Sequence, residues 1–198
     1  MSRKPKIGYK INESIIKPSL SGYLSLPVKL LESREIYSGE LALRKDRFVL
    51  NGREVEKEIL EHRPSVGIVA VSGDSVILVV QYRRAAGRTL LEIPAGKIED
   101  GETPEQAALR EMDEEIGCSG DLKPLMQWYL APGYDTELMH VFVATNLKKI
   151  RNRRQMDDDE NIVVKKVKLK AAVKKCLNGQ IQDCKSVAAL LAYYSKPV

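Results

Sequence analysis

The sequence is poor in the residues that build zinc sites and disulfide frameworks. It has three cysteines and two histidines among 198 residues. The number of cysteines is odd, and neither a Cys-x-x-Cys spacing nor a nearby histidine pair accompanies Cys118, Cys176 and Cys184. This pattern excludes the common structural zinc motifs and predicts reduced thiols. We do not expect a nucleophilic cysteine, because a free cysteine usually behaves as a small apolar residue.

Long apolar runs are also missing. No segment approaches the ~20 apolar residues that a membrane helix needs, and the first residues, Met-Ser-Arg-Lys-Pro-Lys, lack the apolar core of a signal peptide. We therefore expect a soluble, cytoplasmic protein without a membrane partner. Neither sign of charge dominates, because 32 basic and 27 acidic residues are interleaved and the net charge is +5. This composition does not favour nucleic-acid binding.

The chain divides into a short N-terminal part and a larger remainder. Residues 1–27 show no sustained period and predict an irregular arm. From Gly39 to Leu60, apolar residues alternate on both sides of Asn51-Gly52, which predicts a β-hairpin. We expect residues 1–62 to form this arm and hairpin and residues 63–198 to form one domain.

The remaining elements predict a mixed α+β fold, because strands are interrupted by one helix and followed by others. The expected strands are 65–71, 76–82, 90–93, 125–130, 138–145 and 162–169, and the expected helices are 104–116, 170–177 and 183–194.

The first of these helices has clear signals at both ends. Thr103 can cap it, Pro104 fits its first position, and Gln106 completes a capping box. Gly117 supplies the left-handed residue that ends such a helix. A buried stripe is expected at Ala108, Met112 and Ile116.

Three glutamates crowd one patch of this helix. Glu111, Glu114 and Glu115 are spaced i, i+3 and i+4, and like charges at this spacing cost about 0.2–0.5 kcal/mol per pair. A hard cation such as Mg²⁺ would relieve this repulsion and could bridge the carboxylates to a substrate phosphate. The alternative is that the charge run is only a solvated face.

The spacing around these glutamates resembles the signature of the Nudix hydrolases. Gly96 is followed by five residues, Glu102, seven residues and then Arg-Glu-Met-Asp-Glu-Glu-Ile-Gly-Cys, which ends at Cys118. This resemblance implies an α/β/α sandwich with a mixed sheet and a metal-dependent hydrolase in residues 63–198.

Beyond this motif the chain looks like the ADP-ribose pyrophosphatase branch of that family. The matching segments are Gln81-Tyr82-Arg83, Leu91 to Ala95, Ala131-Pro132-Gly133 and Ile181 to Ser186. The resemblance implies hydrolysis of ADP-ribose or a related ADP-sugar to AMP and ribose 5-phosphate, with Mg²⁺, or alternatively Mn²⁺, as cofactor. Two other hypotheses are a Nudix hydrolase of another nucleoside diphosphate sugar or dinucleotide, and a module that binds ADP-ribose without cleaving it.

The resemblance also implies a set of metal-binding and catalytic residues. Glu111 and Glu115 are the main ligands, and their spacing of four independently places them one above the other on the helix. Glu114, the carbonyl of Ala95 and Glu160 complete the set. Asp158 and Glu160, in the acidic run 157–160, are the candidates for the catalytic base, and the register within this run is open.

Further residues are expected to bind substrate or to shape the site. Arg83 would hold a phosphate, with Arg84 as its competitor, and Glu137 would hydrogen-bond substrate or metal-bound water. The branch is typically homodimeric through its N-terminal strands, which implies that Lys57 and Glu58 help to grip the adenosine. The residues expected to hold the loop and helix in shape are Arg110, Glu102 and Gly96.

Overall fold

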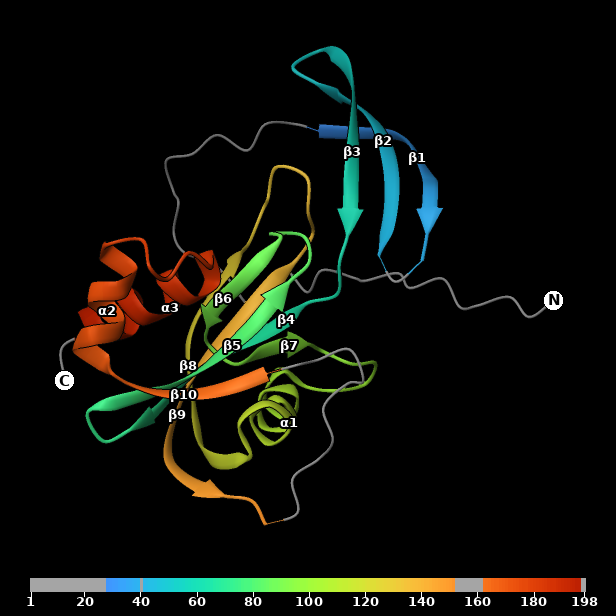
Figure 1. Ribbon diagram of the computed structural model, residues 1–198. Helices are drawn as coiled ribbons and strands as arrows, with labels where there is room; N and C mark the ends of the chain where they lie inside the picture. The colour runs from blue at the N-terminus through green and yellow to red at the C-terminus, as the bar shows by residue number, and fades with distance from the viewer. Residues whose placement is uncertain (1–27, 40, 152–161, 197–198) are drawn as a thin grey trace.

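The computed structural model describes residues 28–39, 41–151 and 162–196, which form two β-sheets and three helices (Figure 1). The arm expected in residues 1–27 lies outside this part of the chain. No helix among the described residues is long and apolar enough to cross a membrane.

The N-terminal sheet contains the expected hairpin and one additional strand. Strands β2 (Ala42–Leu50) and β3 (Arg53–Glu61) are antiparallel. They are joined by Asn51-Gly52 with φ of 53° and 76°, as the tight turn requires. Strand β1 (Val28–Ser38) pairs with β2 and makes a sheet of order β1-β2-β3. The sequence did not reveal β1, because its apolar residues do not alternate and the whole strand is exposed.

The main sheet is mixed, as expected. Its central order is β10-β5-β4-β9-β8, with β6 paired to β5 and β7 paired to β4. Strands β4 and β9 are parallel, whereas the other pairs are antiparallel. The strands are β4 (Ser65–Ser72), β5 (Ser75–Arg83), β6 (Arg88–Glu92), β7 (Ala95–Lys97), β8 (Cys118–Tyr129), β9 (Leu138–Lys149) and β10 (Ile162–Lys168).

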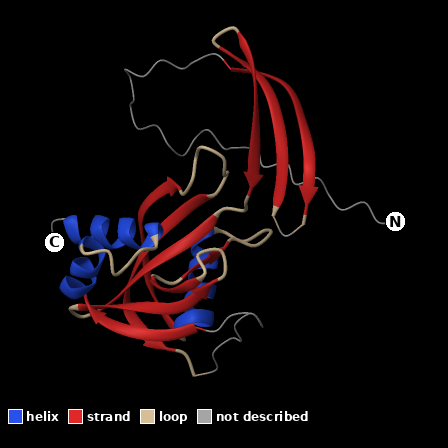
Figure 2. Ribbon diagram, turned by 45° about the horizontal axis from the view of Figure 1, so that its top comes forward, coloured by secondary structure: helices blue, strands red, loops and turns tan. Residues whose placement is uncertain are grey.

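Helices cover both faces of this sheet, and this confirms the α/β/α sandwich (Figures 1 and 2). Helix α1 (Pro104–Ile116) packs on one face over Val66 and Ile68. Helices α2 (Leu169–Leu177) and α3 (Cys184–Ser195) pack on the other face over Val69. The alternation along β4 therefore separates two hydrophobic cores, one for each face.

Helix α1 begins and ends where its caps predict. The side chain of Thr103 accepts a hydrogen bond from the backbone N–H of Gln106, whose side chain in turn accepts one from Thr103 N–H. At the other end Gly117 is left-handed, with φ of 62°. The stripe Ala108, Met112 and Ile116 is buried, as expected.

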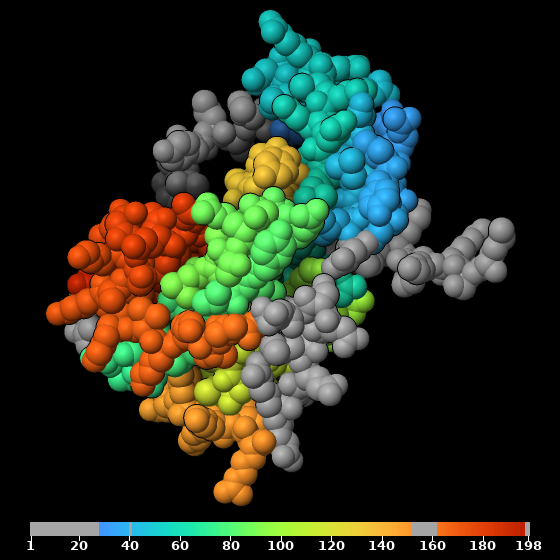
Figure 3. Space-filling model, viewed as in Figure 1, coloured from blue at the N-terminus to red at the C-terminus, as the bar shows by residue number. Residues whose placement is uncertain are grey.

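The N-terminal sheet is joined to the main sheet through the loop between β8 and β9. Leu60, near the end of β3, donates to the carbonyl of Tyr134 at 2.7 Å, and its own carbonyl accepts from Thr136 N–H at 3.1 Å. The backbone N–H of His62 donates to the Thr136 hydroxyl at 2.9 Å. Figure 3 shows the N-terminal sheet standing beside this loop.

Candidate active site

Two buried carboxylates lie where helix α1 meets the short strand β7. Glu111 and Glu115 are 7% and 1% exposed, although glutamates are seldom buried unless they are paired. The Glu115 carboxylate accepts a hydrogen bond from the backbone N–H of Ala95 at 2.9 Å. The helix therefore holds the acidic side chains against the strand that contains Ala95, the expected carbonyl ligand.

Gly96 makes this close contact possible. Its φ is not in the left-handed region, so backbone conformation does not explain the glycine. A Cβ at this position would instead overlap the carboxylate of Glu111, and even the farther oxygen, Oε2, would lie only 2.5 Å away. The missing side chain leaves the space that the Glu111 carboxylate fills.

Arg110 ties the helix to the loop that precedes it. Its guanidinium donates to both oxygens of Glu102, at 3.0 and 3.1 Å, and to the carbonyl of Lys97 at 2.8 Å. It also donates to Glu111 at 2.7 Å and to Glu114 at 2.9 Å. Burial by itself lowers the pKa of Arg110, but the hydrogen bond to Glu102 and the nearby glutamate charges raise it on balance. The arginine therefore stays charged and offsets the repulsion among the glutamates.

Arg83 lies at the end of β5 and is paired with Glu92, at the end of β6. Its Nε and Nη2 donate to the two Glu92 oxygens at 2.9 and 2.7 Å. This pairing raises the pKa of Arg83, to which the charges of Glu115 and Asp183 also contribute. The expected phosphate-binding residue is thus close enough to Glu115 for their charges to interact.

Glu92 and Lys185 lie in segments that the sequence analysis matched to the branch, but it gave neither residue a role. Lys185, on α3, forms an ion pair with Glu92. Burial raises the pKa of Glu92, but Arg83 and Lys185 together lower it below its usual value. Only the fold reveals that they pair, because Lys185 lies 93 positions along the chain from Glu92.

Gln81 is a further residue without a sequence assignment. It is 8% exposed, and its side-chain oxygen has no hydrogen-bond partner among the residues that the structure describes. Since side chains alternate along β5, Gln81 points to the same face as Arg83 and as Val79 of the core beneath α1. A buried acceptor of this kind is costly unless something satisfies it.

The expected substrate residues occupy several places. Glu137 accepts a hydrogen bond from the hydroxyl of Ser65 at 2.6 Å, and its other oxygen lies 3.6 Å from Nδ1 of His62. Lys57 and Glu58 lie on the exposed strand β3 of the N-terminal sheet, apart from the helix α1 glutamates. The structure therefore places Glu137 beside β4, and Lys57 and Glu58 on the N-terminal sheet.

The carboxylates at α1 are suitable for a hard divalent cation, which takes oxygen ligands. Glu111 and Glu115 offer such oxygens, and the absence of a side chain at Gly96 lets the Glu111 carboxylate lie against β7. Within the described residues, no group of three or more acidic, histidine or cysteine side chains is arranged to hold a metal ion. Asp158 and Glu160, the remaining expected acids, lie outside those residues.

Comparison with known proteins agrees with the motif that surrounds these carboxylates. A family model described as the NUDIX domain matches residues 61–186. The chain belongs to the NUDIX family. The resemblance found in residues 96–118 is thereby confirmed over most of the main sheet and its helices.

The alignments of this NUDIX protein with two named relatives span nearly the whole length of those relatives. The ADP-ribose pyrophosphatase of Bacillus subtilis (strain 168) is 36% identical over 170 residues, which are 84% of this chain and 92% of that protein. The methanol dehydrogenase activator of Bacillus methanolicus is 33% identical over 82% of this chain and 90% of its own. A crystal structure of an ADP compounds hydrolase matches with a TM-score of 0.77 at 24% identity, over 87% of this chain and 95% of that one. This last match supports the fold.

Proposed function

We propose that this NUDIX protein hydrolyses the diphosphate bond of ADP-ribose, or of a related ADP-sugar, to AMP and ribose 5-phosphate. The observation that carries the proposal is a pair of buried carboxylates in a complete NUDIX motif: Glu111 packs against Gly96, and Glu115 accepts a hydrogen bond from the N–H of Ala95. The similarity to the ADP-ribose pyrophosphatase of Bacillus subtilis supports this choice of substrate.

Glu111 and Glu115 would hold a divalent cation, Mg²⁺ or Mn²⁺, with Glu114, the carbonyl of Ala95 and Glu160. When bound, such a cation polarises the phosphoryl group and lowers the pKa of a bound water. Arg110 would keep Glu111 and Glu114 oriented, because its guanidinium contacts both. Glu102 fixes Arg110 from the loop side.

The other residues would bind substrate or move a proton. Arg83 would donate to a phosphate oxygen, since guanidinium groups match phosphate geometry. Glu137, already bonded to Ser65, would orient the substrate beside β7. Asp158 or Glu160 would accept the proton of the attacking water.

The first experiment compares AMP release from ADP-ribose and a panel of other nucleoside diphosphate sugars and dinucleotides. We expect Mg²⁺-dependent release from ADP-ribose. Faster hydrolysis of another diphosphate would replace ADP-ribose as the assigned substrate. Mg²⁺-dependent binding of ADP-ribose without release of AMP would favour the hypothesis of a non-catalytic binding module.

The variant Glu115→Gln tests the site itself. It should fold, because glutamine keeps the shape and a side-chain oxygen for the N–H of Ala95, yet kcat should fall by about 10²-fold or more, since even residues that only orient metal ligands are worth about 10–100-fold. Near-normal turnover would remove Glu115 from the metal site.

We also propose a homodimer formed through the N-terminal sheet, with residues 1–62 serving assembly and residues 63–198 serving catalysis. Strand β1 lies at one edge of its sheet and exposes Val28, Leu30 and Tyr37 by about 60% each. Exposed apolar residues on an edge strand are typical of a surface that pairs with another chain. The partner's β3 would then bring its Lys57 and Glu58 to the adenosine.

Light scattering after size exclusion tests the dimer. The double variant Val28→Lys/Leu30→Lys should shift the protein to monomer, while Leu177→Lys, at a 74% exposed position on α2, should leave it dimeric. A wild-type monomer at micromolar concentration would contradict this assembly.

A further inference from the structure

Glu92 is an almost fully buried carboxylate that forms ion pairs with two basic side chains, one from a strand and one from a helix. It is 1% exposed, and it meets the guanidinium of Arg83 from β5 and the ammonium of Lys185 from α3. A buried ion pair is expensive to desolvate and is often replaceable by apolar residues without loss of stability. Stability alone therefore does not explain why this site carries three charged groups.

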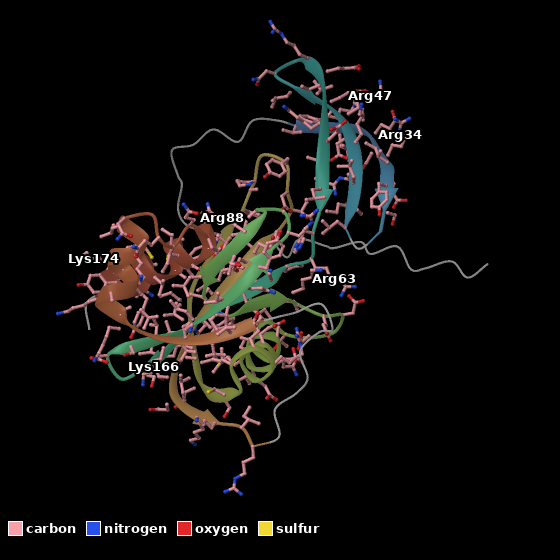
Figure 4. All side chains as sticks on the ribbon, in the orientation of Figure 1. Arg34, Arg47, Arg63, Arg88, Lys166 and Lys174 are labelled. Carbon is pink, nitrogen blue, oxygen red and sulfur yellow. The ribbon has the colours of Figure 1, made fainter. Side chains whose placement is uncertain are left out.

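Helix α3 holds the lysine of this group in place. Asp183 caps the helix by accepting from the backbone N–H of Ser186 at 3.0 Å, and its other oxygen lies 2.9 Å from Nζ of Lys185. The hydroxyl of Ser186 accepts from the backbone N–H of Ile93, directly after β6, at 2.7 Å. Figure 4 shows Arg88, at the start of β6, beside α3; it donates to Gln182 at 2.8 Å.

These contacts control the direction of the Arg83 side chain. The guanidinium group is planar, so fixing Nε and Nη2 on Glu92 also fixes where Nη1 lies. Nη1 takes no part in the pairing with Glu92, because the two hydrogen bonds to Glu92 use the other two nitrogens. Arg83 projects from the same face of β5 as Val79, which belongs to the core beneath α1.

The segment after Glu92 runs directly into the metal-binding strand. Ile93 is held by Ser186, the carbonyl of Pro94 accepts from the backbone of Ile68, and the N–H of Ala95 donates to Glu115. Each residue from 92 to 95 is thus fixed by a different partner. Glu92 is the residue of this segment that faces Arg83.

We propose that Glu92, held by Lys185, is a positioning residue that presents Nη1 of Arg83 to a phosphate of the substrate. The inference rests on the proposed function, because it assigns a cause to the placement of the phosphate-binding arginine. It predicts that Glu92 acts on turnover only through Arg83. A residue that merely stabilised the fold would affect the enzyme whether Arg83 is present or not.

A double-mutant cycle separates these two roles. The specificity constant kcat/KM for ADP-ribose is measured for wild type, Glu92→Gln, Arg83→Ala and the double variant. Glu92→Gln alone should lower kcat/KM by about tenfold or more, the scale of one misdirected charge-assisted hydrogen bond. In the Arg83→Ala background the same change should cost nothing further.

Two additional variants keep the test informative. Asp74→Asn makes the same acid-to-amide change in an ion pair with Lys168 near the opposite end of β5, and should leave kcat/KM unaltered. Because Glu92→Gln leaves two cations facing an amide, Glu92→Gln/Lys185→Met is made alongside it, removing one charge of each sign. This variant should fold and show the same loss of kcat/KM.

The outcomes distinguish the inference from the proposed function. An unchanged kcat/KM in Glu92→Gln, or an equal cost with and without Arg83, overturns the positioning role while hydrolysis of ADP-ribose stands. If the wild type releases no AMP, the proposed function is wrong, and crystal structures of wild type and Glu92→Gln decide the inference. A guanidinium of Arg83 that moves supports it, and one that stays overturns it.

Discussion

The close packing of α1 on β7 makes Gly96→Ala an informative perturbation. The new methyl group would occupy the position of the Glu111 carboxylate, with Oε2 at 2.5 Å and the other two carboxylate atoms nearer still. Ordinary carbon–oxygen contacts are more than 3 Å, so Glu111 must swing away or α1 must lift from the strand by about 1 Å. Either movement displaces a proposed metal ligand.

The expected magnitudes follow from this displacement. Overpacking of a well-filled interior costs about 1–3 kcal/mol in stability, which a domain of this size should survive. A 1 Å misplacement at a reacting centre can cost about 10²-fold in rate. We therefore expect Gly96→Ala to fold and to lose about 10²-fold in kcat/KM, with a much smaller change in the free energy of unfolding.

The assay is AMP release at saturating and at limiting ADP-ribose, beside urea denaturation of the same preparations. Gly133→Ala is the matched control, because a Cβ there meets nothing within 4 Å. Wild-type kcat/KM in Gly96→Ala would refute the reasoning that the glycine exists to admit the Glu111 carboxylate.

Three further predictions concern stability. Thr103→Ala removes the hydroxyl that accepts a hydrogen bond from the backbone N–H of Gln106 at the start of α1. It should lower the free energy of unfolding by about 1 kcal/mol in urea denaturation. Arg110→Ala leaves Glu111 buried without this cation and should cost about 3 kcal/mol by the same measurement. Burial lowers the pKa of His140 from 6.5, so its neutral ring contributes stability above about pH 6.5 that is lost as pH falls through the folded pKa. In denaturation at a series of pH values, His140→Gln should show a shallower loss of stability in that window; an unchanged slope would contradict the assignment.

The sequence predicted best those features that depend on neighbouring residues. The limits of α1 were correct because the cap at Thr103 and the left-handed Gly117 act over a few positions. The turn at Asn51-Gly52 was correct for the same reason. The NUDIX motif identified the family because its spacing places the glutamates on one short helix.

The features that were missed depend on contacts between distant parts of the chain. Strand β7 spans only Ala95–Lys97 and exists because β4 pairs with it. Three residues are too few for an alternating hydrophobic pattern to predict a strand from the sequence. The partnership of Glu92 with Lys185 arises where α3 packs near the end of β6. The sequence analysis named Arg83 as a phosphate-binding candidate, but it could not show the two hydrogen bonds that Arg83 donates to Glu92.

The junction between the two sheets has a mechanical consequence. Leu60 is clasped on both sides by the backbone of Tyr134 and Thr136, and Glu137 follows at once, bonded to Ser65 beside β7. A rigid tilt of the N-terminal sheet would therefore move this loop with it, because these backbone hydrogen bonds join the two. A partner that binds the N-terminal sheet would thereby shift Glu137, a proposed substrate-binding residue.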